Sequence, residues 1–222
     1  MRVKQTSTAA LVFALGLLFG VVPAFAQASN GPLSNLTAQW WQFIGSIPTA
    51  VNPGLDATGA DCVVGQRGPV WFLAGWFGSG AATRNCSIPA GEWLFFPVVN
   101  YVNVNTPSCG TGNQSAAELR AQSAPVIDGA TNLSVQVDGR QVERLPRVKS
   151  EVFAISFPAD NIFGLACLPA GTYSPAVDDG FYVLLEPLKV GKHTLHIHGE
   201  IPSISFVLDV TYNLTVIPVL LK

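Results

Sequence analysis

Charged side chains are scarce in this chain. Asp, Glu, Lys and Arg make up 12% of its 222 residues, against about a quarter in ordinary soluble domains. The net charge is −2 and the basic residues form no stripe, which argues against a nucleic-acid partner. Repeats of about 20 to 50 residues and linkers rich in Gly, Ser or Pro are also missing. We therefore expect one mature domain.

Signatures of known catalytic machinery are missing as well. The chain contains no GxSxG, no P-loop and no HExxH, which removes the commonest nucleophile, nucleotide and zinc motifs. There is also no CxxC among its four cysteines, so a zinc ribbon or a thioredoxin-like site is not expected. An even number of cysteines in an exported chain favours two disulfides.

We predict the pairs Cys62–Cys86 and Cys109–Cys167. The first two cysteines flank the first apolar strand, and the glycine-rich loop at 78–80 allows the chain to double back between them. The other two lie in long irregular segments that have few ladder hydrogen bonds and need a covalent connection.

Long apolar runs are missing except at the N-terminus. The sequence begins with the basic MRVK, continues with an apolar stretch from Leu11 to Val22, and reaches the small-x-small pattern Ala24-Phe25-Ala26. The stretch is shorter than the ~20 residues that span a bilayer. The pattern therefore predicts a secretory signal peptide over 1–26 rather than a membrane anchor. The mature domain, 27–222, is then secreted or periplasmic and has no membrane span.

The chain is rich in apolar, β-favouring sequence. The segment 68–105 holds two runs, PVWFLAGW and EWLFFPVVN, on either side of a loop of Gly, Ala and Ser, which indicates two core strands. Alternating patterns and the Asp138-Gly139 turn predict further strands and hairpins; these lie at 133–142, 148–157, 181–188, 193–198 and 204–217. The expected fold is all-β: an antiparallel β-sandwich or jelly roll of about eight strands.

One amphipathic helix is predicted, between Pro32 and Pro48. Its apolar stripe is formed by Leu33, Leu36, Trp40, Phe43, Ile44 and Ile47. Neighbouring helical residues point about 100° apart, so only one of Trp40 and Trp41 is expected in the core. The alternative is that these two residues form a sugar-stacking platform. A shorter helical piece, SAAELRAQSA, is expected to stop at Pro125.

Five segments together resemble a family of uncharacterised exported bacterial β-sandwich proteins. The resemblance covers most of the mature chain. It implies export, paired cysteines and an all-β fold, and it implies no activity and no catalytic residue. The segments are GQRGPVWFLAG (65–75), RNCSIPAGEWLFFPVVN (84–100), VDG (137–139), DDGFYVLLEPLKVGKHTLHIHG (178–199) and VTYNLTV (210–216).

The histidines occur together in one predicted strand, at 193–200. His196, His198 and Glu200 share one face of that strand because side chains alternate. The two imidazoles lie about 6.6 Å apart along the strand, so this face is a candidate site for a divalent metal, in the style of cupin-like sites. The chain has no matching later His in a PxGxxH run, and the alternative is a strand face exposed to water. The same parity places Asp209 beside the two histidines.

Aromatic and amide side chains gather around the second core strand. Asn100, Tyr101 and Asn103 follow this strand, and Trp93 precedes it; an aromatic plane with amide hydrogen bonds is typical of a sugar-binding face. Arg84 borders the same stretch and could hold a carboxylate with two hydrogen bonds. The alternative interpretation is an ordinary strand end and a structural arginine.

Two functions remain open from the sequence. The first is an exported binding or structural module for carbohydrate or another cell-surface component. The second is an extracytoplasmic, carbohydrate-active enzyme that uses a metal on the face of His196, His198 and Glu200, or a pair of carboxylates about 5–10 Å apart. The strand-associated acids that could form such a pair are Glu92, Glu151, Glu186 and Glu200. The sequence assigns neither a ligand nor a reaction.

We expect the exported protein to begin at Gln27, because signal peptidase cleaves after the small-x-small pattern. Intact-mass spectrometry of the protein recovered outside the cytoplasm measures this directly. A mass that still includes residues 1–26 would contradict the signal peptide and restore the membrane-anchor interpretation.

Overall fold

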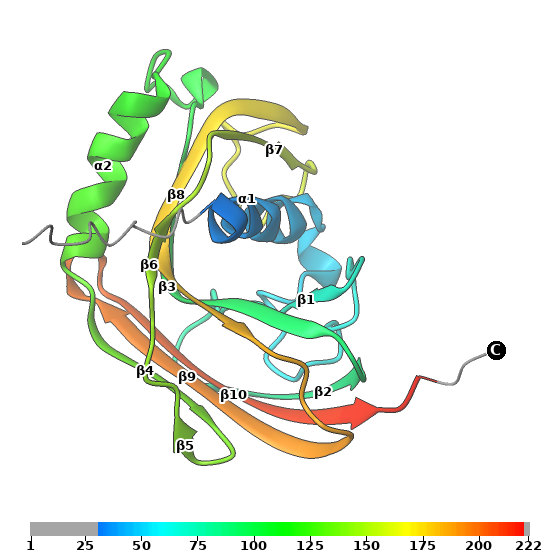
Figure 1. Cartoon of the computed structure of the whole chain (residues 1–222). Coiled ribbons are helices and arrows are strands. Elements are labelled where there is room, and N and C mark those ends of the chain that lie inside the picture. The colour runs from blue at the N-terminus through cyan, green and yellow to red at the C-terminus, as the bar shows by residue number, and fades with distance from the viewer. Residues whose placement is uncertain (1–30, 220–222) are drawn as a thin grey trace, which may run out of the picture.

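Two β-sheets and two α-helices make up the computed structural model, which describes residues 31–219 (Figure 1). The predicted signal peptide, 1–26, lies outside these residues. The first sheet, called sheet A below, has the strand order β1-β3-β8-β6, with β7 also paired to β8. Its strands are β1 (Val70–Phe72), β3 (Trp93–Val104), β6 (Arg147–Lys149), β7 (Phe153–Phe157) and β8 (Gly171–Leu185).

The second sheet, sheet B, has the order β2-β10-β9-β4-β5. It is formed by β2 (Ala82–Pro89), β4 (Thr131–Val137), β5 (Arg140–Gln141), β9 (Gly191–Ile201) and β10 (Phe206–Ile217). The chain is therefore mostly β, as the sequence predicts. The strand order is that of a two-sheet β protein and does not by itself assign a jelly-roll topology.

The helices cover the two faces of sheet A. Sheet A curves around α1 (Gly31–Ser46), whereas α2 (Ala116–Asp128) lies on the outer side of the curve (Figure 1). Three short 3-10 helices, η1 (Thr49–Val51), η2 (Pro107–Cys109) and η3 (Pro202–Ile204), connect other elements. This arrangement creates two main apolar cores, one between the sheets and one between sheet A and α1.

Strand β3 contributes to both cores because its side chains alternate. Leu94 and Phe96 are fully buried between the sheets, while Phe95 faces α1. The pairing with β8 shifts by one residue between Pro97 and Val99, and such a bulge changes which side chains share a face. The bulge places Asn100 on the α1 side, where its amide reaches Tyr182.

The sheets are mixed rather than purely antiparallel, which corrects the sequence-based expectation. Strand β1 runs parallel to β3, and β2 runs parallel to β10. The chain leaves sheet A after β1, forms β2 in sheet B, and returns to sheet A as β3, and this crossover makes β1 and β3 parallel. Strand β2 was not predicted, because Arg84 and Cys86 occupy inward positions of an otherwise regular alternation, where apolar residues are expected.

Strand β8 is longer than predicted, and it begins at Gly171 inside a segment expected to be irregular. Its sequence TYSPAVDDG contains residue types that favour turns. Tertiary contacts override this preference: Asp178 accepts a hydrogen bond from Trp41 of α1, and Asp179 accepts one from Arg147 of β6. Gly180 is required by close packing, since a Cβ there would lie 2.6 Å from the Cβ of Asn100. The predicted strand at 148–157 is instead divided into β6 and β7.

Both tryptophans of α1 are buried, which corrects the expectation that only one enters the core. Trp40 is 0% and Trp41 3% exposed. The reason is the curvature of sheet A, which surrounds α1 on more than one side. Helix α2 also differs, because it continues past Pro125 to Asp128. The proline removes one backbone hydrogen bond near the helix end, the one that would reach the carbonyl of exposed Ala121.

The predicted hairpins are confirmed. Asp138 and Gly139 both have positive φ (51° and 75°) in the turn between β4 and β5, as a type I′ turn requires. Strands β9 and β10 pair antiparallel, with His198 opposite Asp209. Apolar side chains of this hairpin point into the inter-sheet core, and the histidine face is partly exposed. Asp209 therefore lies beside the histidines on the outer face of sheet B, as the alternation predicts.

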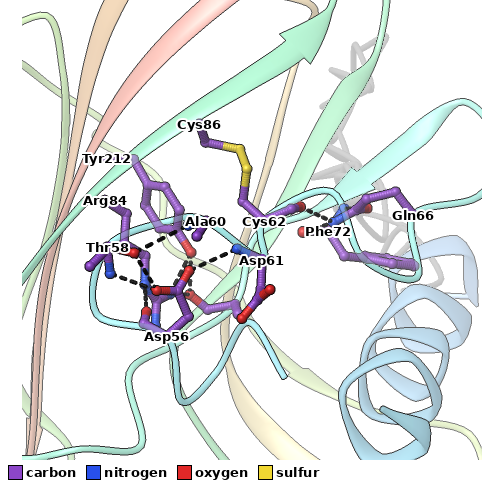
Figure 2. The surroundings of a disulfide bond; sticks show 11 residues. Asp56, Thr58, Ala60, Asp61, Cys62, Gln66, Phe72, Arg84, Cys86 and Tyr212 are labelled. Atoms are coloured by element: carbon purple, nitrogen blue, oxygen red, sulfur yellow. Dashed lines mark hydrogen bonds between the residues drawn. A yellow bond between two sulfur atoms is a disulfide. The ribbon is translucent and has the colours of Figure 1, made fainter. Parts of the chain in front are cut away.

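Both disulfides pair as predicted. Cys62 bonds to Cys86 with a Cα–Cα distance of 6.0 Å, and Cys109 bonds to Cys167 at 4.9 Å. The first disulfide attaches the loop that carries Asp56 to β2 of sheet B (Figure 2). Among the described residues there is no free cysteine.

Removing either disulfide should destabilise the domain. For closed loops of 24 and 58 residues, the chain-entropy model gives about 3–4 kcal/mol each. We expect the free energy of unfolding, measured with urea, to fall by about this amount in the Cys62→Ala/Cys86→Ala and Cys109→Ala/Cys167→Ala variants. A loss of less than about 1 kcal/mol in either double variant would contradict this assignment of the disulfides as main structural connections.

Candidate functional site

A cavity of about 190 Å³ opens at the edge of β3, where that strand passes the end of β1. One wall comes from the α1 side of sheet A and one from the start of β10. Aromatic and aliphatic side chains dominate the surface. The lining residues outside β3 that matter most here are Trp40, Trp41, Trp76, Phe77, Phe163 and Phe206. We call this cavity the aromatic pocket.

Consecutive residues of β3 line the aromatic pocket, from Pro97 through Val102. Neighbouring side chains of a strand point to opposite faces of the sheet. A cavity that touches every residue in such a run therefore lies along the edge of the strand, beside its backbone. The bulge at Pro97–Val99 lies in this stretch, and β1 has already ended.

A buried carboxyl group lies behind the pocket wall. Asp178 is 0% exposed, and one of its oxygens accepts a hydrogen bond from Trp41 Nε1 at 2.7 Å. The other oxygen accepts from Tyr182 Oη at 2.7 Å, and Tyr182 Oη in turn accepts from Asn100 Nδ2 at 2.9 Å. This chain of hydrogen bonds, called the Asp178 network below, orients Trp41 and Asn100, both of which line the pocket.

Burial changes the acidity of this network. Loss of hydration raises the pKa of Asp178 to about 8, and the hydrogen bonds from Tyr182 and Trp41 oppose this rise only in part. The same burial, together with the neighbouring Asp178, raises the pKa of Tyr182 well above its usual value. The folded protein therefore holds the Asp178 proton up to a higher pH than the unfolded chain does. The carboxyl does not line the pocket, so its observed contacts are structural.

The ligand-binding residues predicted from the sequence do not form one site. Asn100 and Tyr101 line the aromatic pocket. Asn103 faces the opposite side, where its amide bonds to Leu119 O and Ser123 Oγ of α2. Trp93 lies seven residues before Asn100 along β3, about 23 Å away, and is partly exposed.

Arg84 is a buried structural residue in this fold. It is 1% exposed, and its guanidinium donates to the carbonyl oxygens of Asp56, Ala74 and Gly75 and to Tyr212 Oη. Figure 2 shows this arginine beside Tyr212 and the Asp56 loop. These contacts engage all three guanidinium nitrogens, which would otherwise bind a ligand carboxylate. They also fix Gly75, which lines the pocket.

The histidine face is a row of contacts between histidine and carboxylate side chains on the outside of sheet B. His196 Nε2 lies 2.9 Å from Asp209 Oδ1, and His198 lies 3.4 Å from Glu200 and 3.7 Å from Asp209. The third histidine, His193, contacts Asp138 at 2.7 Å and so holds the β4–β5 turn. The Asp138 contact raises the pKa of His193.

The geometry gives the metal hypothesis no support. Within residues 31–219, no group of three or more His, Cys, Asp or Glu side chains is arranged to hold a metal ion. His196 and His198 instead pair with the acids nearest to them. The carboxylate-pair hypothesis is equally unsupported at the pocket, whose described lining includes no acidic side chain.

The residues that build the pocket carried little signal in the sequence. Asp178 and Asp179 lie in a segment that was expected to be irregular, although both are buried in β8. Trp76 and Phe77 lay at the end of an apolar run, and their position beside β3 depends on where β1 stops. The one available signal was the pair Trp40-Trp41, for which a platform was the alternative interpretation; the sequence does not show which residues lie beside it.

Stability should depend on the ionisation of Asp178. Because its folded pKa is raised from 3.8 to about 8, the folded state retains a proton that the unfolded state loses. The contribution of this proton to the free energy of unfolding is complete below pH ~4. It decreases as the pH rises to about 8, by up to ~1.4 kcal/mol per pH unit. Urea unfolding from pH 5 to 8 should show this slope in the wild type, and Asp178→Asn should flatten it.

Asp61→Asn is the matched control, since Asp61 is partly exposed and none of the described histidine contacts involves it, so its removal should leave that slope in place. Equal slopes in the wild type and Asp178→Asn would contradict the buried protonated carboxyl.

No protein-family model matches this chain, and comparisons with curated proteins and with solved structures find no match. None of the helices in residues 31–219 has the length and apolar character needed to cross a bilayer.

Proposed function

We propose that this chain is an exported binding module whose aromatic pocket accepts one ring-sized apolar group of a ligand. The observation that carries the proposal is the pocket itself: a cavity of about 190 Å³ at a strand edge, lined by Trp41, Trp76 and Phe163. A cavity of about 150 Å³ lined by apolar side chains is large enough for benzene. Two disulfides fit a protein that works in an oxidising compartment.

Binding explains the pocket better than catalysis does. Tyr101 is the one titratable side chain among its described lining residues, so neither an acid–base pair nor a nucleophile with a base is present there. Asp178 lies behind the wall and keeps its hydrogen bonds within the protein. The pocket supplies shape, apolar contact and a small number of hydrogen bonds, which are the features of a binding site.

The chemistry of the lining favours an apolar or aromatic group over a sugar. A sugar ring carries hydroxyl groups around its edge, and each one that is buried needs a partner. Asn100 is the one amide side chain of the described lining, and its Nδ2 is already committed to Tyr182. Carbohydrate, the ligand class expected from the sequence, therefore remains the alternative occupant of the same pocket.

Binding of indole tests the proposal. An aromatic group buries 150–250 Å², which at about 25 cal/mol/Å² gives ~4–6 kcal/mol and a Kd on the order of 0.1–1 mM. Indole should shift the NMR signals of the Trp41 and Trp76 indole N–H groups in the mature protein. Gly75→Leu should raise the Kd at least tenfold, because Gly75 lines the pocket and a Cβ there would lie 3.7 Å from Leu208 Cδ1, which belongs to the same lining.

Gly171→Leu is the matched control: Gly171 has the same 3.7 Å space for a Cβ as Gly75 and does not line the pocket. This variant should bind indole as the wild type does. Equal affinity in wild type and Gly75→Leu, or binding of methyl glucoside in place of indole, would contradict the proposal.

A further inference from the structure

Strand β3 has an open edge beside the aromatic pocket. On one side β3 pairs with β8 along almost its whole length, from Leu94 to Val104. On the other side it pairs with β1 over Trp93–Phe95, followed by one more bond from Leu73 N to Phe95 O. Within residues 31–219, no strand pairs with this side of β3 after that point.

The direction of the backbone groups follows from one hydrogen bond at the end of the strand. Asn105 N donates to Pro175 O at 2.9 Å, so residue 105 directs its backbone groups toward β8. In an antiparallel ladder this direction alternates, and the register from 99 to 104 is unbroken. The N–H and C=O groups of Asn100 and Val102 therefore point away from β8, into the open edge.

These four backbone groups have no hydrogen-bond partner in the part of the chain that the structure describes. They are spaced two residues apart, as the groups of a neighbouring strand would be. Buried or half-buried backbone groups normally have partners, and Asn100 and Val102 are both half-buried. Their pattern is complementary to one kind of ligand, which is another extended polypeptide.

Protection against strand addition is weak along this edge. Natural edge strands commonly carry lysine or inward-pointing charges that prevent pairing. Residues 97–104, PVVNYVNV, contain no charged side chain. Pro97 and the bulge after it interrupt the ladder only at the end next to β1. At Asn100 and Val102 the edge therefore has no charged side chain of its own strand, and no bulge, that would prevent pairing with another strand.

We propose that the ligand of the aromatic pocket is an extended, uncharged peptide segment that adds as a strand to β3. This inference rests on the proposed binding function and names the ligand class. The peptide backbone pairs with Asn100 and Val102, and a large apolar side chain fills the pocket against Trp41 and Phe163. The next side chain points to the opposite wall, formed by residues such as Phe206, so consecutive apolar residues are favoured. This mode of recognition is β-augmentation.

A second copy of the same protein fits this edge less well. The open edge is recessed, because Trp40 and Phe77 stand on one side of it while Ile204 and Phe206 stand on the other. A single strand can enter such a trough. The edge of a second domain would bring its own layers on both faces, and these would collide with the same walls.

Selection from a display library of linear seven-residue peptides tests the proposal. The target is the mature protein with both disulfides, and the library is first depleted on Gly75→Leu. We expect enriched peptides that carry consecutive apolar residues and no charge at the core positions, and that compete with indole. The best peptide is then resynthesised with a single N-methyl group at each position in turn, which removes one backbone N–H at a time.

Strand addition predicts that N-methylation at alternate positions weakens binding at least tenfold, while the positions between them change it less than about threefold. This alternation arises because every second N–H of the peptide faces β3. Uniform effects along the peptide, or an absence of enriched peptides from a protein that binds indole, would overturn the strand-addition proposal and leave the binding function standing. If the mature wild-type protein does not bind indole, the proposed binding function itself is overturned. A dimer that excludes the peptide would assign the edge to a second copy.

Discussion

A pair of neighbouring acids on β8 joins the two helices to the two faces of sheet A. Asp178 faces α1, where Trp41 and Tyr182 donate to its carboxyl oxygens. Asp179 faces the other side, where it accepts two hydrogen bonds at 2.8 Å from Arg147, which also pairs with Asp128 of α2. Removing a partner from a buried polar network leaves an unsatisfied group that costs about 1–3 kcal/mol. The Asp178 carboxyl is therefore one of the polar contacts that attach α1 to sheet A, beside the apolar core that they share.

The aromatic pocket is a consequence of the position of α1. The Asp178 network draws Trp41 into the curve of sheet A and sets the amide of Asn100 at the edge of β3. Arg84 acts from the opposite side, because it holds the carbonyl groups of Ala74 and Gly75 where β1 has already ended. The chain then turns away as Trp76 and Phe77, and the space that a longer β1 would fill becomes the pocket.

Local pattern was enough to predict the parts of the fold that depend on neighbours in sequence. The alternation of β9 and β10 and the Asp138-Gly139 turn follow from spacing, whereas the disulfide pairs were predicted from the segments in which the cysteines lie. The parallel partners of β1 and β2, the burial of both Trp40 and Trp41 and the length of β8 depend on contacts between distant segments. In two of these cases, β2 and the first half of β8, a polar residue at an inward position concealed the strand, because the partners of Arg84 and Asp178 lie elsewhere in the chain.

Amide hydrogen exchange of the mature protein, resolved by residue along β3, tests the open edge most directly. The amides of Tyr101 and Asn103 face β8 in the ladder, whereas those of Asn100 and Val102 face the pocket edge. An open edge at β3 predicts slow exchange at Tyr101 and Asn103, and exchange at least tenfold faster at Asn100 and Val102. Equal protection at all four amides would mean that the edge is already occupied, and it would contradict a binding site at β3.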